Sequence, residues 1–371
     1  MPVRNMSTTE VVLHNIQVYY TPILVHLGLL GNILSVCVFF GTKLRRASSS
    51  IYLGALAISD SGFLVMVCLV WLNEFNIHLF NESGYCQSIV YVSAVCSFLS
   101  VWLVVAFTVE RYVAVKYPLR RQSLCTIARA KVVIIGLTVL AILLSGPFLL
   151  FSGPRKVPTR YGNTTLCYLA TGWESWANAY NYVDTVLTFA VPLTMIVIFN
   201  TLIARNIYKH DHVRRTLTIE SDVSNEKDAR NARDRMPQTK VTKMLLIVSS
   251  AFLCLNMPSF VLRMFAFYDQ SQKYWLISAQ QMCNILFNTS FGINFILYCA
   301  SGQNFRKEMV RMFIHRPRVG RNGTLIQMAN QGKQYVSDFT RRWSSTKRSS
   351  VDNVQRQDSQ ETRKLPISEK L

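Results

Sequence analysis

The chain has 371 residues, of which 50% are hydrophobic and only 16% are charged. A soluble protein of this composition would expose large apolar patches to water, so the composition favours a protein embedded in lipid. The formal net charge of +20 would suit a nucleic-acid partner, but the basic residues gather in loops beside apolar segments. That placement fits the anionic inner surface of a bilayer, and no nucleic-acid partner is expected. The nine cysteines show no metal-ligand spacing, so no metal site is predicted from them.

Seven long apolar segments follow one another along the chain. Each has about 20 or more residues, which at ~1.5 Å per residue is enough for a helix to cross a hydrocarbon layer of ~30 Å. Helices of soluble proteins seldom stay apolar on all sides for so long. The segments predict an all-α membrane protein, a bundle of seven transmembrane helices within residues 20–300. They are Tyr20–Phe40, Ile51–Leu72, Ile89–Tyr112, Val132–Phe151, Tyr182–Ile207, Val241–Tyr268 and Leu276–Cys299.

The loops between these segments are basic on one side only. Lys43, Arg45 and Arg46 follow the first segment and further basic residues follow the third, whereas the loop 73–85 has no Lys or Arg. Short basic loops lie in the cytoplasm, so the sequence predicts a multi-pass plasma-membrane protein with its N-terminus outside and its C-terminus in the cytoplasm. Residues 1–19, the predicted extracellular N-terminus, have no apolar core of signal-peptide type, so no cleaved signal is expected.

Two cysteines lie on the predicted outer side. Cys86 is at the outer mouth of the third segment, and Cys167 is in the long loop between the fourth and fifth segments. Both face an oxidising compartment, and this topology favours a disulfide between them over two free thiols. Glycosylation triplets begin at Asn5 and Asn163 on the same side, which agrees with the outer assignment.

Residues 301–314 predict a short amphipathic helix after the seventh segment. Phe305 and Met309 recur at helical spacing opposite Arg306, so this eighth helix is expected to lie along the membrane surface. Residues 315–371 are polar and cannot bury enough apolar area to fold alone, so they are expected to form a disordered cytoplasmic tail. Its hydroxyls beside basic residues suit phosphorylation, and an inert solvated tail is the alternative.

Asp60 lies in the middle of the second segment. A carboxylate at that depth is costly unless it is paired or hydrated, so it marks a functional site by default. Its candidate companions are Asn32, Ser100 and Asn294, in the first, third and seventh segments. Together these residues can hold a small hydrated cavity or a sodium ion through oxygen ligands. A purely structural polar network is the alternative, and the sequence leaves both open.

The motif Glu110-Arg111-Tyr112 closes the third segment on its inner side. Arg111, at a helix end, can pair with Glu110 and then move to another acceptor, which makes a two-state element. The alternative is an arginine that merely extends its charged end to the membrane boundary.

Short motifs recur at set depths of the apolar segments. In order, they are Gly31-Asn32, Leu56-Ala57 with Asp60, Cys86, Glu110-Arg111-Tyr112, Phe189 with Pro192, Phe252 with Pro258, and Asn294 with Tyr298. From Tyr20 to about Phe313, this ordered set resembles the rhodopsin-like G-protein-coupled receptors. The resemblance implies that an outer ligand opens the inner face and that a heterotrimeric G protein binds there, with Arg111 in the contact. It also implies that receptor kinases and arrestin act on the tail.

Several residues depart from the family's pattern. Asn256 stands where the family usually has Trp, Phe295 where it has Pro, and Gln238 where it has an acid. Arg111 therefore lacks its familiar ionic partner, and Thr242, one turn further, can accept a hydrogen bond from it instead. The resemblance assigns the G-protein switch to Glu110, Arg111, Tyr112, Thr242, Asn294 and Tyr298.

The resemblance also limits the ligand. The outer half of the third segment has Ser93 and Ser97 but no Asp, and the seventh segment has no Lys. A biogenic amine would lack its acidic partner and retinal would lack its Schiff-base lysine, so both are excluded. Mixed charges, amides and aromatics under a long outer loop suit a short peptide better than a lipid. The candidate ligand-binding residues are Trp71, Glu74, Ser93, Ser97, Asp184, Arg263, Gln280, Asn284 and Asn288.

Arg263 is the candidate with the most specific physical argument for a ligand contact. An arginine at that depth requires a carboxylate or carbonyl partner. The partner is either the ligand or an internal acid, Glu74 or Asp184, and the sequence leaves both open. In overall pattern the chain is similar to the invertebrate neuropeptide-receptor branch, with the CNMamide type as one expectation within it.

Other classes of membrane protein have sequence features that can be looked for in this chain. A same-fold receptor for a non-peptide small molecule and an arrestin-biased receptor are the nearer alternatives, and Asn256 and Phe295 keep the second one open. A transporter or channel would need a continuous polar path and commonly has internal repeats, and neither is found in the sequence. No segment has a His-Glu-x-x-His or Gly-x-Ser motif with a nearby base, so the chain is not expected to be an enzyme.

Overall fold

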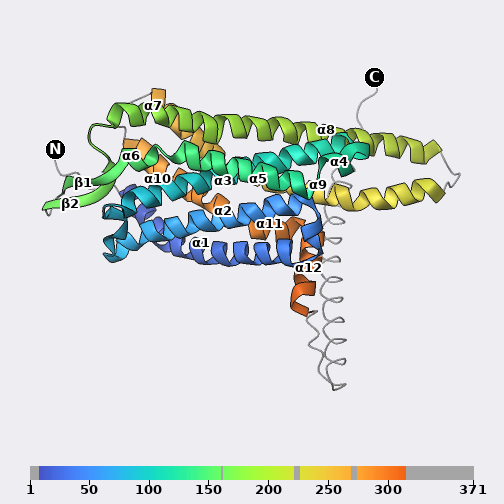
Figure 1. Cartoon of the computed structure of the whole chain (residues 1–371), viewed down its shortest axis with the longest axis horizontal. Coiled ribbons are helices and arrows are strands. Elements are labelled where there is room, and N and C mark those ends of the chain that lie inside the picture. Colours follow the sequence, from blue (N-terminus) through green and yellow to red (C-terminus); the bar gives the residue numbers. More distant parts are fainter. Residues whose placement is uncertain (1–7, 160–161, 221–225, 269–273, 315–371) are drawn as a thin grey trace, which may run out of the picture. The chain divides into compact units, whose positions relative to one another are not determined.

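The structure is a computed structural model. It describes residues 8–159, 162–220, 226–268 and 274–314. The chain divides into two compact units, Met1–Met309 and Val310–Leu371, and the features described below belong to the first. Figure 1 shows that this unit consists of long helices that run side by side, together with one small hairpin.

Within the described residues, six helices are long and apolar enough to cross a membrane, and a bent pair of helices makes a seventh span. This confirms the predicted all-α, seven-span fold. In chain order the spanning elements are α1 (Thr8–Gly41), α2 (Ser48–Trp71), α3 (Tyr85–Lys116), α5 (Ile127–Ser145), the continuous series α7 (Glu174–Thr185), η5 (Val186–Ala190) and α8 (Val191–Glu220), then α9 (Glu226–Tyr268), and the pair α10 (Tyr274–Gly292) and α11 (Asn294–Ser301).

Shorter helices join these spans or flank them. They are η1 (Lys43–Arg46), η2 (Leu72–Phe75), η3 (His78–Asn81), η4 (Pro118–Arg120), α4 (Arg121–Leu124), α6 (Phe148–Phe151) and α12 (Gln303–Ile314). The last of these corresponds to the predicted amphipathic helix.

Two helices extend well before the apolar segments that they contain. α1 starts at Thr8 rather than at Tyr20, and α9 starts at Glu226 rather than at Val241. The first residues of α9 are rich in Glu, Lys, Ala and Arg, which are strong helix formers. Hydropathy marks only the part of a helix that lies in lipid, so it placed the start of both helices too late.

The seventh span bends by 55° between Gly292 and Asn294. Gly292 lies so close to Gly28 of α1 that a Cβ on Gly28 would come within 3.0 Å of the Gly292 Cα. Two residues without side chains let α10 and α1 approach to this distance. The bend lies directly after this contact, in a span that has Phe295 where the resemblance leads one to expect proline.

The long loop after α6 forms an antiparallel hairpin, which the sequence analysis did not predict. β1 (Ser152–Thr159) pairs with β2 (Gly162–Leu169), at one end of the helices in Figure 1. A disulfide joins Cys167 of β2 to Cys86 of α3, with an S–S distance of 1.95 Å. The backbone N–H of Cys167 also donates to Asn81 Oδ1 at 3.0 Å. The predicted disulfide is confirmed, and it attaches the hairpin to the outer end of α3.

Some predicted features lie outside the described residues. These are the glycosylation site at Asn5 and the tail over residues 315–371. The second predicted glycosylation site, Asn163, lies in β2.

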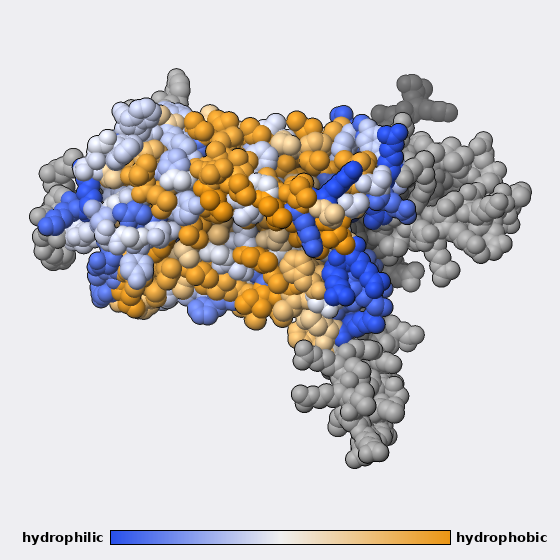
Figure 2. All heavy atoms as spheres, in the orientation of Figure 1, coloured by the Kyte–Doolittle hydropathy of each residue, from blue (hydrophilic) through white to orange (hydrophobic). Residues whose placement is uncertain are grey.

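A hydrophobic belt surrounds the spans on the face that Figure 2 shows, and hydrophilic residues border it at both ends. α5 is the span that contributes most to this surface. Only 11% of its most apolar window is buried inside the protein, compared with 33% to 44% in the other five single-helix spans. The surface of α5 is therefore mainly a lipid-facing surface.

The start of α12 is anchored under the bundle. Phe305 is only 2% exposed, and its ring packs against the rings of Phe39 and Tyr298 at centroid distances of 5.2 and 5.5 Å. Arg306 Nη1 donates to the backbone carbonyl of Cys299 at 2.5 Å. This satisfies a carbonyl that the end of α11 leaves without a helical partner.

Candidate functional site

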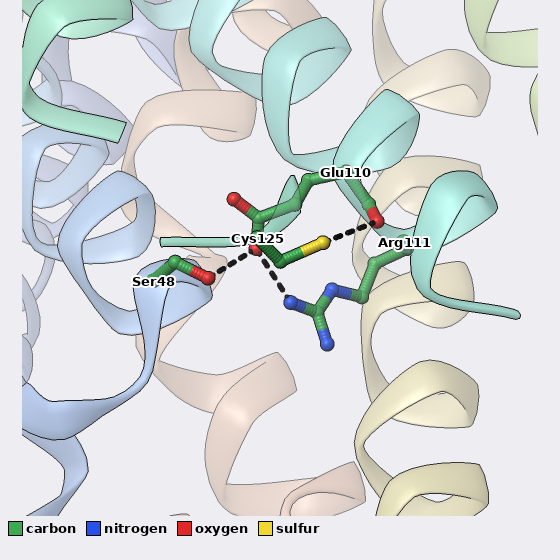
Figure 3. Close-up of polar contacts among 4 residues, drawn as sticks. All are labelled: Ser48, Glu110, Arg111 and Cys125. Carbon is green, nitrogen blue, oxygen red and sulfur yellow. Dashed lines mark hydrogen bonds and ion pairs between the residues drawn. The ribbon is translucent and has the colours of Figure 1, made fainter. Parts of the chain in front are cut away.

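A buried ion pair closes the inner end of α3. Arg111 Nη2 lies 2.6 Å from Glu110 Oε1, and the two side chains are only 7% and 10% exposed. The hydroxyl of Ser48, the first residue of α2, donates to the same carboxylate oxygen at 2.7 Å. Figure 3 shows these side chains converging from α2 and α3. Because two donors meet on one charged oxygen, Glu110 is held in a single position.

Cys125 borders this ion pair just after α4 (Figure 3). Its Sγ lies 3.8 Å from the backbone carbonyl oxygen of Glu110. Burial raises the pKa of the Cys125 thiol, and the charge of Glu110 raises it further, so the thiol is neutral at neutral pH. Burial also lowers the pKa of Arg121, and the positive charge of Arg111 lowers it further. Neither neighbour supplies a second anion for Arg111.

A narrow gap separates α3 from α8 and α9 beside the ion pair. Arg111 and Thr242 both line it, together with Asn200 and Ser249, and it is too small to hold a water molecule. Arg111 Nε is buried without a hydrogen-bond partner in the described part of the chain. The Nε–H of Arg111 is therefore an unused donor beside a gap that Thr242 also lines.

Asp60 is buried in α2, and both of its carboxylate oxygens accept hydrogen bonds. Ser100 of α3 donates to Oδ1 and Asn294 of α11 donates to Oδ2, each at 2.7 Å. The structure thus brings two of the three expected companions to Asp60. The third, Asn32, instead donates to the backbone carbonyl of Phe291 at 3.0 Å. Carboxylate, hydroxyl and amide oxygens are the ligands that hard cations prefer, so these residues fit a sodium ion.

The residues that depart from the expected motifs fit their surroundings. A Cβ on Gly31 of α1 would come within 2.8 Å of Phe295 Cβ, so this glycine makes room for Phe295. Asn256, buried in α9, donates its side-chain amide to the Phe252 carbonyl one turn earlier at 2.8 Å. The side chain of Gln238 lies outside the described residues. Packing therefore accommodates Phe295, whereas Asn256 satisfies its amide N–H but leaves its Oδ1 buried without a hydrogen-bond partner among the described residues.

The two tyrosines of the predicted switch are packed differently. Tyr298 is fully buried and meets Phe39 edge-on at 5.3 Å, while its hydroxyl has no hydrogen-bond partner among the residues described. Tyr112 packs against Phe199 at 5.3 Å and lies under the ammonium of Lys116. The unsatisfied hydroxyl of Tyr298 is a group that a different arrangement of the helices can satisfy.

Arg263 of α9 forms an ion pair in the outer half of the bundle. Its Nη1 lies 3.3 Å from Asp184 Oδ2 of α7, and its guanidinium lies 4.8 Å from the centre of the Phe189 ring. Asp184 also accepts from Thr188 at 3.0 Å. Of the two internal acids that the sequence allowed, the structure pairs Arg263 with this one. The arginine side chain is still 35% exposed, so part of it is open to a ligand.

The outer ends of α1 and α2 are joined by two polar contacts. Glu74 Oε2 lies 3.6 Å from His14 Nε2, and Trp71 Nε1 donates to the Val18 carbonyl at 3.0 Å. The sequence analysis missed His14 as a partner because it began the first span at Tyr20, after His14.

The remaining candidate ligand residues lie on α3 and α10. Gln280 Nε2 donates to Asn284 Oδ1 at 3.0 Å, as their spacing of four residues allows, and both side chains are exposed. Asn288, Ser93 and Ser97 are half-buried. The structure therefore places all of these residues in the spans as expected, but only Arg263 and Asp184 among the candidates form an ion pair with each other.

Ser48 is a site residue that the sequence analysis missed. It begins a run of three serines, Ser48 to Ser50, that are all 5% to 6% exposed. Buried serines at the inner end of a span signal a polar cluster, but they do not reveal the partner. Glu110, the partner, is 62 positions away in the sequence.

Known proteins resemble this chain over most of its length. The pattern of the 7 transmembrane receptor (rhodopsin family) matches residues 31–302. The thyrotropin-releasing hormone receptor of Gallus gallus is 29% identical over 303 residues, which cover 76% of this chain and 74% of that receptor. The Gq-coupled rhodopsin of Mizuhopecten yessoensis is 26% identical over 300 residues, 80% of this chain and 59% of that protein. The B1 bradykinin receptor of Macaca fascicularis is 27% identical over 297 residues, 77% and 79% of the two chains.

Proposed function

Because the chain belongs to the rhodopsin family of seven-transmembrane receptors, we propose that it binds an extracellular neuropeptide and activates a heterotrimeric G protein at the cytoplasmic face of the plasma membrane. The inner ion pair between Arg111 and Glu110 carries this proposal. Ser48 of α2 also holds Glu110, so a ligand that shifts α2 against α3 can loosen the pair, and Arg111 is then free to contact a G protein.

The peptide ligand is supported by the character of the outer site and by the relatives. Two of the three relatives named above are, by name, receptors for thyrotropin-releasing hormone and for bradykinin. The third is a rhodopsin, but this chain has no Lys in its seventh span to hold retinal. Arg263 and Asp184 offer both signs of charge to a ligand with charged or amide groups. Within this class we place the chain with invertebrate neuropeptide receptors, of the CNMamide type.

Cells that express the chain provide the direct test. A peptide library, read out through calcium and cAMP, should contain an agonist that gives a signal absent from untransfected cells. Receptor kinases and arrestin, which we propose as partners of the tail, can be followed by arrestin recruitment with the same agonist. A response to small molecules alone, or arrestin recruitment with no G-protein signal, would replace the proposed function with one of its two nearer alternatives.

Arg263→Ala should raise the agonist concentration needed for a half-maximal response at least tenfold, ~1.4 kcal/mol, because the ligand loses a charge-assisted contact. The measurement is a dose–response curve at matched surface expression. Arg263 is also paired with Asp184, so the internal role must be separated from the ligand contact.

The charge-swapped variant Arg263→Asp with Asp184→Arg makes that separation. It keeps an internal ion pair but moves the positive charge to the other helix. Potency that stays low in the swapped variant supports a ligand contact by Arg263. Potency that returns to the wild-type value would show that Arg263 serves only the internal pair.

A sodium ion beside Asp60 is part of the proposal, since the Asp60 carboxylate and the Ser100 hydroxyl bring oxygen atoms together at one buried point, while Asn294 donates its amide N–H to the same carboxylate. Replacing sodium by a bulky organic cation should raise agonist potency roughly threefold or more in the wild type, if the ion favours the inactive arrangement. The Asp60→Asn variant should show no such sodium effect. If the agonist potency at the wild-type receptor is the same with and without sodium, no sodium ion binds beside Asp60.

A further inference from the structure

An open groove lies at the inner end of the bundle between α1, α2 and α5. Its volume is about 650 Å³, which is within the usual range for small-molecule sites. Apolar side chains form its walls, and three cations, Arg45, Arg46 and Lys131, lie at its lining as well. The apolar lining residues are Phe40, Ile51, Ala55, Ile58, Ile127, Ile134 and Ile135.

The groove opens toward lipid. One of its walls belongs to α5, the span that is least buried by the rest of the protein. Ile58 on α2 is 56% exposed and Ile135 on α5 is 63% exposed. In the orientation of this receptor family, η1 and the start of α5 are at the cytoplasmic side, so the groove meets the inner leaflet. Figure 2 shows hydrophilic residues beside the hydrophobic belt at the end of the bundle where α4 lies.

Small residues on α2 create the space. A Cβ on Gly54 would clash with the Phe40 ring, so the ring lies directly against the α2 backbone. Ala55, the next residue, contributes only a methyl group to the lining. A larger side chain at Ala55 would fill the groove, and one at Gly54 would displace the Phe40 ring that lines it.

The three cations are available to an anion. Arg45, Arg46 and Lys131 are exposed, and none of them takes part in the ion pairs found among the described residues. Three positive charges at one end of an apolar groove complement a headgroup that carries several phosphates, and the isoleucine walls complement an acyl chain. A headgroup with a single charge would use only part of this set.

We propose that the groove binds a phosphoinositide of the inner leaflet, with its phosphates on Arg45, Arg46 and Lys131 and an acyl chain along the isoleucines of α2 and α5. This site is separate from the outer ligand site and from the inner ion pair. The proposal depends on the family's orientation in the membrane, but not on which agonist the receptor takes.

Native mass spectrometry of the purified full-length protein tests this proposal. With phosphatidylinositol 4,5-bisphosphate in mixed micelles, the wild type should retain one lipid more tightly than it retains phosphatidylcholine. The triple variant Arg45→Gln, Arg46→Gln and Lys131→Gln should bind about a hundredfold more weakly, because each basic residue near an anionic surface contributes about fivefold. Unchanged binding by this variant would overturn the proposal.

A matched control removes three exposed cations elsewhere on the inner side, by Arg120→Gln, Arg205→Gln and Lys307→Gln. This variant has the same net charge as the groove variant and should bind the lipid as the wild type does. An equal loss in both variants would mean that the lipid senses only the overall surface charge, and the groove would then not be its site.

Ala55→Phe tests the apolar half of the site while it leaves every charge in place. The bulky ring should exclude the acyl chain and lower the affinity at least about fivefold, whereas soluble inositol trisphosphate should bind weakly to wild type and variant alike. Lipid binding that survives this change would overturn the proposed position of the chain. Thermal melting and size-exclusion profiles like those of the wild type show that each variant is folded.

Discussion

An Arg111→Ala receptor should reach the cell surface and bind its agonist, but G-protein activation should fall about a hundredfold or more, ~2.8 kcal/mol. Arg111 is 7% exposed and pairs with Glu110 at 2.6 Å, far from the outer pair of Arg263 and Asp184 at the other end of the spans. Its removal therefore takes away the group proposed to contact the G protein while the outer ligand site keeps its residues. Agonist binding and G-protein activation, measured on the same cells, check this. Coupling that survives would refute the role given to Arg111.

Ser48→Ala should act on the same switch in the opposite direction. It removes one of the two donors that hold Glu110 Oε1, so the ion pair is less firmly fixed in the arrangement seen here. A hydrogen bond to a charged group contributes about 1 kcal/mol or more, so basal signalling should rise about fivefold at equal expression. Ser49→Ala, the adjacent buried serine, is the control and should leave basal signalling unchanged. If the two variants behave alike, Ser48 has no specific part in the switch.

Loss of the disulfide between Cys86 and Cys167 should give the largest effect on stability. The bond closes a loop of 81 positions, and a cross-link over that length contributes roughly 4 kcal/mol by restricting the unfolded chain. Cys167→Ser should therefore lower the melting temperature by roughly 10 °C in purified protein. It should also weaken agonist responses, because the hairpin of β1 and β2 is no longer tied to the outer end of α3.

Two comparisons isolate the disulfide from a general effect of losing a cysteine. Cys37→Ser changes an exposed free thiol and should leave the melting temperature unchanged. A reducing agent applied to the wild type should reproduce the Cys167→Ser result and should have no further effect on that variant. A Cys167→Ser protein that melts like the wild type would contradict the stabilising role.

The long loop that contains β1 and β2 was only partly predicted from the sequence. Topology alone placed both cysteines on the oxidising side, and the disulfide followed from that. The hairpin itself was not predicted. Two short polar strands between membrane spans do not stand out in a hydropathy profile, and these strands contain few of the β-branched residues that favour β-structure. The pairing of Ser152 with Leu169 through Thr159 with Gly162 became visible only in the fold.

The sequence by itself determined the spans, their sidedness and the family. Each of these depends on quantities summed along the chain, such as apolar length and loop charge, or on short motifs in order. It also predicted the depths of Asp60, Arg111 and Arg263, because depth follows from position within a span.

Only the tertiary structure decided which side chains meet. Glu110 meets Ser48 across 62 positions, Arg263 meets Asp184 across 79, and Asn294 meets Asp60 across 234. Such contacts depend on how each helix is rotated and how closely its neighbours approach, and these are set by packing contacts such as Gly28 on Gly292. The lipid-facing groove arises in the same way, from three elements that no local pattern in the sequence brings together.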